Sequence, residues 1–402
     1  SARGADGIAG RERAARGAEP AAAGGRRAEA PARDRAPRVP RGGGLARARQ
    51  RLRQGGARRV SAGEPRRVQQ PLPARAEPHR RRLHARRAES FADMTDLPSA
   101  LRLQLDSEIR IWTTSVARHQ VAEDGTEKLL LQLHDGQQIE CVLLRDGIRR
   151  TVCISSQVGC AMGCVFCASG LDGVIRNLTT GEIVEQLLRL TRLLPEDERL
   201  SHIVVMGMGE PLANLDRLLP ALAMAQNPEG LGISQRRITI STVGLPSAID
   251  RLCEENPGYH LAVSLHAADD LLRTKLVPVN KSIGIDAILA AADRYWETSG
   301  RRLTFEYVLL GNLNDSPDNA RALARFLGKR AALVNVIPYN SVAGLPWEEP
   351  TDVSRERFLD VLRNAGVNVQ TRRRKGSRID AACGQLRRLA IQENSVSAES
   401  DT

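Results

Sequence analysis

The chain of 402 residues is long enough for a catalytic domain of barrel or doubly wound size with an accessory segment. Its seven cysteines are too few and too unevenly spaced for a disulfide-built scaffold, so we expect reduced thiols with metal-binding or catalytic roles. The chain shows neither the layout of a signal peptide nor an apolar run of membrane-spanning length, which predicts a cytoplasmic protein.

The formal net charge of +12 originates in the first part of the chain. Residues 1–90 contain 24 Arg, no Lys and 8 acidic residues, so the remaining residues carry 35 basic and 39 acidic side chains. This segment has no aromatic residue before Phe91, and its Ala, Gly, Pro and Arg cannot bury enough apolar surface to offset the entropy of ordering. An RNA-binding tail is one interpretation. We favour another, in which residues 1–84 are a disordered or non-native leader of the kind that GC-rich DNA encodes upstream of a start; Met94 lies close to where ordinary composition resumes.

Residues 85–145 are predicted to form an accessory domain. Thr95 or Asp96 is the expected N-cap of a helix in LPSALRLQL. Residues 128–147 are then expected to form two strands joined at a His-Asp-Gly turn, which is a hairpin signal.

Beyond this hairpin, short β-rich runs alternate with segments of helical period. The β-rich runs are residues 151–155, 202–207, 237–242, 260–266, 304–310 and 333–339. The first long helix opens with Thr179 three residues before Glu182, the spacing of a capping box. This alternation predicts a parallel α/β fold over residues 146–390, with strands buried on both faces, followed by a disordered tail over 391–402.

We expect an open, partial (βα)6 TIM-like barrel rather than a doubly wound sheet, because polar residues repeatedly follow the strand ends. Barrel active sites are built on that rim. The residues expected there are Gly209, Glu210, Ser241, Ser264, His266 and Asn340.

Three cysteines share one short loop, with the spacing C-x3-C-x2-C: Cys160, Cys164 and Cys167. A structural zinc site needs four ligands, usually two C-x2-C pairs, and the sequence has no second pair. A [4Fe–4S] cluster can instead use three cysteines and leave one iron open to another ligand. A zinc site or a set of buried thiols is the alternative.

The cysteine loop, directly after a first strand, resembles that of the radical S-adenosylmethionine (SAM) enzymes. The wider chain resembles the RlmN/Cfr family of adenine methyltransferases over residues 85–390. The matching segments occur in the same order and are CISSQVGC, NLTTGEIVEQ, VVMGMGEPL, ITISTVG, SLHA, IPYN and IDAACGQL.

The resemblance implies a barrel of the radical SAM type with two cofactors, a [4Fe–4S] cluster and SAM, of which two molecules are used per turnover. Cys160, Cys164 and Cys167 would hold the cluster, whose open iron would bind the amino and carboxylate groups of SAM. The residues that match the family's SAM contacts are Gly209, Glu210, Ser241, Ser264, Leu265, His266 and Asn340.

Two further cysteines and one glutamate match the family's catalytic positions. Taken alone, Cys383 fits a small buried residue or an accessible thiol in a basic loop. The resemblance implies that one SAM methylates Cys383, and that a 5′-deoxyadenosyl radical from a second SAM abstracts hydrogen from this methyl group. The methylene radical would then add to adenine C2. Glu140 matches the base that removes the C2 proton, and Cys153 the resolving thiol that frees the product through a transient disulfide with Cys383.

The implied partners are 23S rRNA, in the peptidyl-transferase centre, and tRNA, at the adenine 3′ of the anticodon. We also expect an electron donor such as flavodoxin or ferredoxin, no membrane partner and a monomer. The basic run Arg372–Lys375 is placed for phosphate contacts, although a solvated charge run is the ordinary explanation. The competing functions are methylation of C8 of the same rRNA adenine and a non-enzymatic, metal-containing RNA-binding protein.

Overall fold

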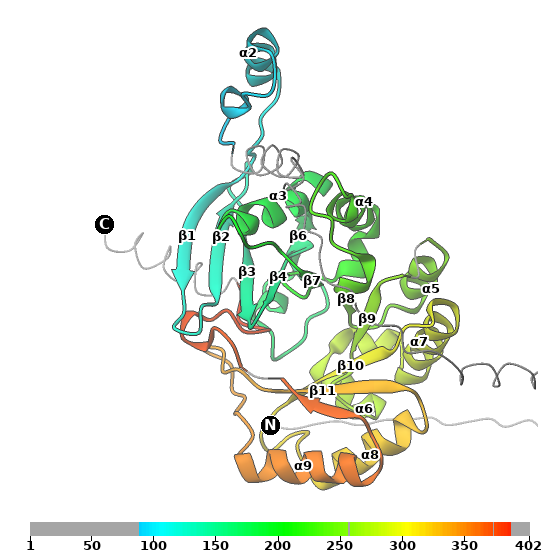
Figure 1. Cartoon of the computed structure of the whole chain (residues 1–402). Coiled ribbons are helices and arrows are strands. Elements are labelled where there is room, and N and C mark those ends of the chain that lie inside the picture. Colours follow the sequence, from blue (N-terminus) through cyan, green and yellow to red (C-terminus); the bar gives the residue numbers. More distant parts are fainter. Residues whose placement is uncertain (1–87, 256–257, 373, 387–402) are drawn as a thin grey trace, which may run out of the picture. The chain divides into compact units, whose positions relative to one another are not determined.

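The computed structural model describes residues 88–255, 258–372 and 374–386 (Figure 1). The predictions made for residues 1–84 and 391–402 lie outside the described residues. No helix within the described part of the chain is long and apolar enough to cross a membrane.

One ten-stranded sheet, in the order β1-β2-β3-β4-β7-β8-β9-β10-β11-β12, organises the described residues (Figure 1). Strands β1 to β4 are antiparallel, and from β4 onward each pair is parallel. The ten strands are β1 (Ser115–Val121), β2 (Glu127–Gln132), β3 (Gln138–Asp146), β4 (Arg149–Cys153), β7 (His202–Val205), β8 (Ile238–Thr242), β9 (His260–Ser264), β10 (Leu303–Leu309), β11 (Ala332–Pro338) and β12 (Val369–Thr371). A two-stranded hairpin of β5 (Gln157–Gly159) and β6 (Val174–Asn177) stands apart from this sheet.

Helices connect the parallel strands, which gives the partial barrel that the sequence predicts. They are α3 (Thr180–Thr191), α4 (Leu215–Gln226), α5 (Pro246–Glu255), α6 (Asp270–Leu276), α7 (Ile285–Ser299), α8 (Pro317–Leu327) and α9 (Asp352–Asn364). Their apolar faces pack with the strands into one main core that runs from Leu129 to Leu386.

The prediction that the parallel strands are buried on both faces holds only in part: β9 and β10 each have three successive buried residues, but β8 does not. Along β8, Ile238, Ile240 and Thr242 are buried, whereas Thr239 and Ser241 are only half-buried. The helices cover one face, and the alternate residues of the strand line the hollow side of the partial barrel. The barrel therefore keeps an internal space in which polar side chains can meet a ligand.

In the N-terminal region, the predicted start of one helix is wrong, and one strand has no signal in the sequence. Helix α2 (Ser99–Glu108) begins after Pro98, which is its N-cap, and not after Thr95 or Asp96. Proline disfavours helical geometry in the residue before it, so the helix cannot start upstream of Pro98. Strand β1 was not predicted because six of its seven residues are exposed and it carries no apolar alternation.

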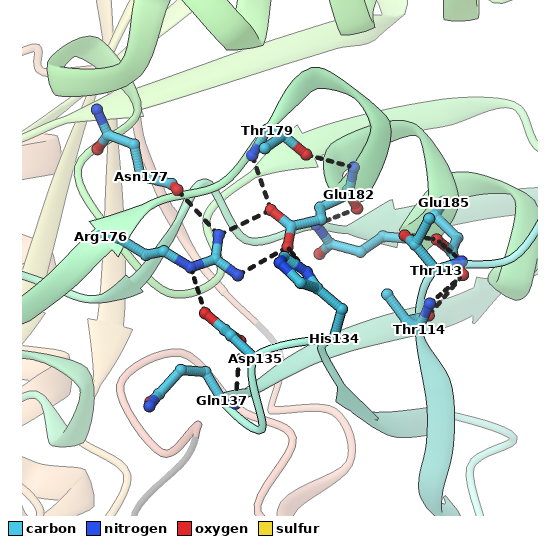
Figure 2. A network of polar contacts seen from close by, with 11 residues as sticks. Thr113, Thr114, His134, Asp135, Gln137, Arg176, Asn177, Thr179, Glu182 and Glu185 are labelled. Carbon is cyan, nitrogen blue, oxygen red and sulfur yellow. Dashed lines mark hydrogen bonds and ion pairs between the residues drawn. The ribbon is translucent and has the colours of Figure 1, made fainter. Parts of the chain in front are cut away.

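A polar network joins the hairpin turn and the segment before β1 to helix α3 (Figure 2). Glu182 forms the expected capping box with Thr179, and its carboxylate accepts two hydrogen bonds from Arg176, of 2.8 and 2.9 Å. The same guanidinium donates to Asp135 of the β2–β3 turn. One turn further along α3, Glu185 accepts four hydrogen bonds from the backbone and hydroxyl groups of two threonines, Thr113 and Thr114.

We expect Glu182→Gln to lower the free energy of unfolding by about 2 kcal/mol at pH 7, because it removes the charge from a largely buried, hydrogen-bonded pair. Burial opposes ionisation of Glu182, but the hydrogen bonds from Arg176 and Thr179 outweigh it and hold its pKa below the ordinary value of 4.5. A carboxyl with a depressed folded-state pKa stabilises the fold above its unfolded pKa, and this contribution disappears as the pH falls through the folded-state pKa. The difference from the wild type in urea unfolding should therefore shrink in acid.

The control Glu254→Gln, on the exposed side of α5, should change stability by less than about 0.5 kcal/mol. Equal stability of wild type and Glu182→Gln at pH 7 would contradict this account.

Candidate active site

The three cysteines of the predicted cluster lie on the loop that the β5–β6 hairpin carries. The backbone N–H of Val165 donates to Leu276, and its carbonyl accepts a 2.8 Å hydrogen bond from the Trp347 indole. Burial raises the pKa of all three thiols, that of Cys160 to about 12. A cluster bound through these sulfurs would stabilise their thiolate form.

The three cysteines line one cavity, here called the cysteine-loop cavity, with nearly all the residues predicted to bind SAM. Its walls include Cys160, Cys164, Cys167, Gly209, Glu210, Ser241, Ser264, His266, Asn340 and Cys383. The strand-end residues meet here because the carboxyl ends of parallel strands share one edge of the sheet. Leu265 is the exception: its side chain is fully buried in the main core, and its backbone N–H donates to Glu306.

Gly209 and Glu210 occupy positions that other residue types would not fill. Gly209 has a φ of +102°, and a Cβ there would lie 2.7 Å from the backbone nitrogen of Gln157. The buried Glu210 carboxylate accepts hydrogen bonds from the backbone N–H groups of Leu212 and Val243, at 3.0 and 2.9 Å. Burial raises the pKa of Glu210 to about 7. Among the described residues Glu210 forms no ion pair, so it can accept hydrogen bonds from a cationic ligand.

The fold leaves one polar atom of Asn340 without a hydrogen-bond partner among the described residues and fixes the orientation of the His266 ring. The Oδ1 atom of Asn340 is buried and has no hydrogen-bond partner among the described residues, which suits a ligand donor. His266 adopts a φ of +63° and packs edge-on against Phe166. Its Nδ1 accepts a hydrogen bond from Val308, which puts the proton of the neutral ring on Nε2, and burial lowers its pKa to about 3.

Arg273, which the sequence analysis did not single out, holds the strand ends together. It is fully buried, and its guanidinium donates to the carbonyls of Val243, Ser264 and Leu265. Burial lowers its pKa to about 10. In the sequence, Arg273 is one of several charged residues of helix α6. Such a pattern is typical of any solvated helix, so it does not single out Arg273.

A second cavity, here called the inner cavity, has a volume of about 480 Å3 and contains both Cys153 and Cys383. Both are free thiols. Burial, with the nearby Cys383 thiol, raises the pKa of Cys153 to about 12, and the charge of Arg372 opposes this rise. Cys383 lines both cavities, and so do Ile337, Pro338, Asn340 and Arg372, so the two cavities share a wall.

Residues 374–386, here called the Cys383 loop, are anchored on the first strands of the sheet. The N–H of Gly376 donates to Asp124 in the β1–β2 turn, and Lys375 Nζ donates to the carbonyl of Arg145. Gly376 has a φ of +65°, and a Cβ there would lie 2.9 Å from the Thr126 methyl group.

Glu140 lines neither of these two cavities. It is buried in β3, where its carboxylate forms a 2.9 Å ion pair with the equally buried Lys128 of β2. Its backbone carbonyl accepts a hydrogen bond from Ser155, just past the end of β4. Glu140 thus lies beside the rim of the barrel.

The basic run differs from a simple surface patch. Arg372 is half-buried and lines both cavities, with its guanidinium 3.7 Å from the Met206 sulfur. Arg374 pairs with Glu349, and Lys375 anchors the Cys383 loop. Arg373 lies outside the described residues.

The arrangement of the site fits an iron–sulfur cluster that binds SAM through its open iron. Three thiols face a buried carboxylate and an unpartnered amide oxygen across one cavity.

Comparisons with known proteins agree with this geometry. The Radical SAM superfamily model matches residues 154–324. The solved structure of a radical SAM methyltransferase from Sphaerobacter thermophilus matches with a TM-score of 0.74 and 43% identity, over 76% of this chain and 92% of that protein. Fold and site together define a radical SAM enzyme.

Two relatives narrow the class further. The probable dual-specificity RNA methyltransferase RlmN of Rhodopirellula baltica is 62% identical over 316 residues, covering 79% of this chain and 85% of the relative. The protein of the same name from Moorella thermoacetica is 47% identical over 312 residues, covering 76% and 88%. The chain belongs to the RlmN family, whose cofactors are a [4Fe–4S] cluster and SAM.

Anaerobically purified protein should be brown and contain about four irons per chain, because three thiolates on one loop suit a [4Fe–4S] cluster. Cys164→Ala should lose most of the iron, measured by metal analysis and visible absorption. The matched control Cys253→Ser, in helix α5 and outside both cavities, should retain it. Colourless wild-type protein with one zinc would overturn the assignment.

Proposed function

We propose that this enzyme methylates C2 of a specific adenine in 23S rRNA, and the adenine 3′ of the tRNA anticodon, through a methyl group carried on Cys383. The observation that carries the proposal is the place of Cys383 in the shared wall of the two cavities. It lines one cavity together with the three cysteines of the cysteine loop and the other together with Cys153.

The broader activity follows from the family: the chain is a SAM-dependent RNA methyltransferase. We place it in the cytoplasm with its RNA substrates, as a monomer served by a one-electron donor such as flavodoxin or ferredoxin.

Methylation of adenine C2 requires a residue that carries the methyl group and delivers it as a radical. C2 of adenine lies between two ring nitrogens and is electron-poor, so it does not attack an electrophilic methyl group, whereas a carbon radical can add to it. When bound, the cluster and SAM supply the methyl group for Cys383 and a primary carbon radical that abstracts one of its hydrogens. Cys383 then presents the methylene radical to C2, and a thioether joins enzyme and RNA.

Glu140 and Cys153 resolve this adduct. After the adduct has lost one electron to a one-electron acceptor, the C2–H bond breaks, its electron pair returns to the ring, and the proton passes to the Glu140 carboxylate. The Cys153 thiolate then attacks the Cys383 sulfur. The S–S bond forms as the S–CH2 bond breaks, and the electron pair left on the methylene carbon takes up a proton to give the methyl product.

The charges of the inner cavity support an RNA substrate. Its wall includes the basic residues Arg149, Arg237, Arg372, Arg374 and Lys375, against a single acidic residue, Asp146. Such an excess of positive charge attracts the phosphate backbone. The target base must still leave its stack to reach Cys383, as enzymes that act on bases require.

Mass spectrometry of nucleosides from treated, unmodified 23S rRNA tests the proposed function. We expect 2-methyladenosine from the wild type and no methylated adenosine from Cys383→Ala, because that variant has no sulfur to carry the methyl group. Formation of 8-methyladenosine would overturn the regiochemistry. Methylation by Cys383→Ala at the normal rate would overturn the whole route.

Cys153→Ala should accumulate a covalent protein–RNA adduct, because nothing then attacks the Cys383 sulfur to release the product. The adduct would appear on a denaturing gel as a slower band that ribonuclease removes. Cys141→Ala is the matched control, since Cys141 is likewise buried in the main core but lines neither cavity. Release of product by Cys153→Ala without any adduct would remove Cys153 from its assigned role.

A further inference from the structure

Lys128 contacts both Glu140 and the Cys383 loop. Its ammonium lies 2.9 Å from Glu140 Oε1 and donates a 3.3 Å hydrogen bond to the backbone carbonyl of Asp380. Side-chain exposure is 3% for Lys128 and 5% for Glu140. An ion pair this well shielded from water is costly to form unless its geometry is well satisfied, so its presence in a sheet calls for a reason.

The sheet register explains how the pair forms. Glu140 lies opposite Leu130, and Lys128 lies opposite Val142, so Lys128 and Glu140 are diagonal neighbours on one face of the β2–β3 pair. Val142 also pairs with Cys153 across β3 and β4 and lines the inner cavity. The ion pair is therefore on the sheet face that carries the resolving cysteine.

The second contact reaches the loop that carries Cys383. Asp380, three residues before Cys383, adopts a left-handed conformation with a φ of +48°. This conformation is uncommon for a residue other than glycine, and the hydrogen bond from Lys128 to its carbonyl helps to fix it. Arg378 anchors the same loop through an ion pair with Glu123, but that pair is exposed and remote from the base.

We infer that Lys128 is a positioning residue for the reaction: it holds the Glu140 carboxylate in place and ties it to the loop that carries the methyl group. This inference rests on the proposed role of Glu140 as the base. One side chain thereby positions both the base and the loop that carries the thioether. When the C2–H bond breaks, the proton moves to Glu140 and its electron pair stays in the ring, while Lys128 keeps its own proton.

The test is a single-turnover reaction of the anaerobic holoenzyme with unmodified 23S rRNA, followed by three readouts. These are S-methylation of Cys383 by peptide mass spectrometry, the fraction of enzyme in the RNA adduct on a denaturing gel, and the methylated adenosine released. For Lys128→Met we expect Cys383 to be methylated normally, the adduct to accumulate as in Glu140→Gln, and product release to fall about 100-fold. Lys128→Arg, which keeps the charge and the donors, should recover product release to within about tenfold of the wild type.

Arg378→Met is the matched control, because it removes another cationic anchor of the same loop without touching Glu140. It should not accumulate the adduct. If Lys128→Met and Arg378→Met both lose Cys383 methylation without forming an adduct, Lys128 acts only on the loop and the inference is overturned. Product release by Lys128→Met at the wild-type rate overturns it as well.

Lys128→Met leaves a buried carboxylate without its ammonium partner and could fail to fold, so the double variant Lys128→Met/Glu140→Gln removes both charges. If Lys128 acts through Glu140, the double variant should release product at the same rate as Glu140→Gln alone. A further tenfold loss would show that Lys128 acts independently of the base and would overturn the inference.

The failure of this inference can be distinguished from failure of the proposed function. If neither Glu140→Gln nor Cys153→Ala forms an adduct, the thioether route itself is wrong, and the role of Lys128 is overturned with it. If both accumulate the adduct and Lys128→Met does not, only the role of Lys128 is lost.

Discussion

The active site depends on how the Cys383 loop is held against the first strands of the sheet. Ala381 and Leu386 of the loop pack into the main core. Polar contacts fix the rest of it: Gly376 to Asp124, Lys375 to the Arg145 carbonyl, and Lys128 to the Asp380 carbonyl. Its far end is joined to the cysteine loop by the hydrogen bond from Ala168 to the Gly384 carbonyl. With both ends tied, Cys383 is held in the wall that the two cavities share.

The antiparallel strands β1 to β3 provide the surface on which this loop docks. They extend the sheet beyond the parallel strands, and the turn between β1 and β2 supplies the surface on which the Cys383 loop lies. The same strands bury Lys128 and Glu140 beside the rim. The network around Arg176, Glu182 and Glu185 in turn joins the β2–β3 turn and the segment before β1 to helix α3 (Figure 2).

The hollow side of the barrel explains why so many polar groups can be buried together. Glu210, His266, Asn340 and Arg372 all face internal space rather than close-packed core. Burial raises the pKa of Glu210 to about 7 and lowers that of His266 to about 3. A filled barrel core of branched apolar residues would leave no room for either a cofactor or a flipped base.

The sequence by itself determined the features that have a local signal. The C-x3-C-x2-C spacing brings three thiols onto one loop, the capping box starts α3 at Thr180, and the alternation of strands and helices sets the barrel. Only the tertiary structure decided that Cys383 meets Cys153, that Glu140 pairs with Lys128 rather than with water, and that Arg273 ties the strand ends together. The physical reason is that these contacts join residues far apart in the chain. Such contacts follow from sheet register and loop docking, which leave no periodic trace in the local sequence.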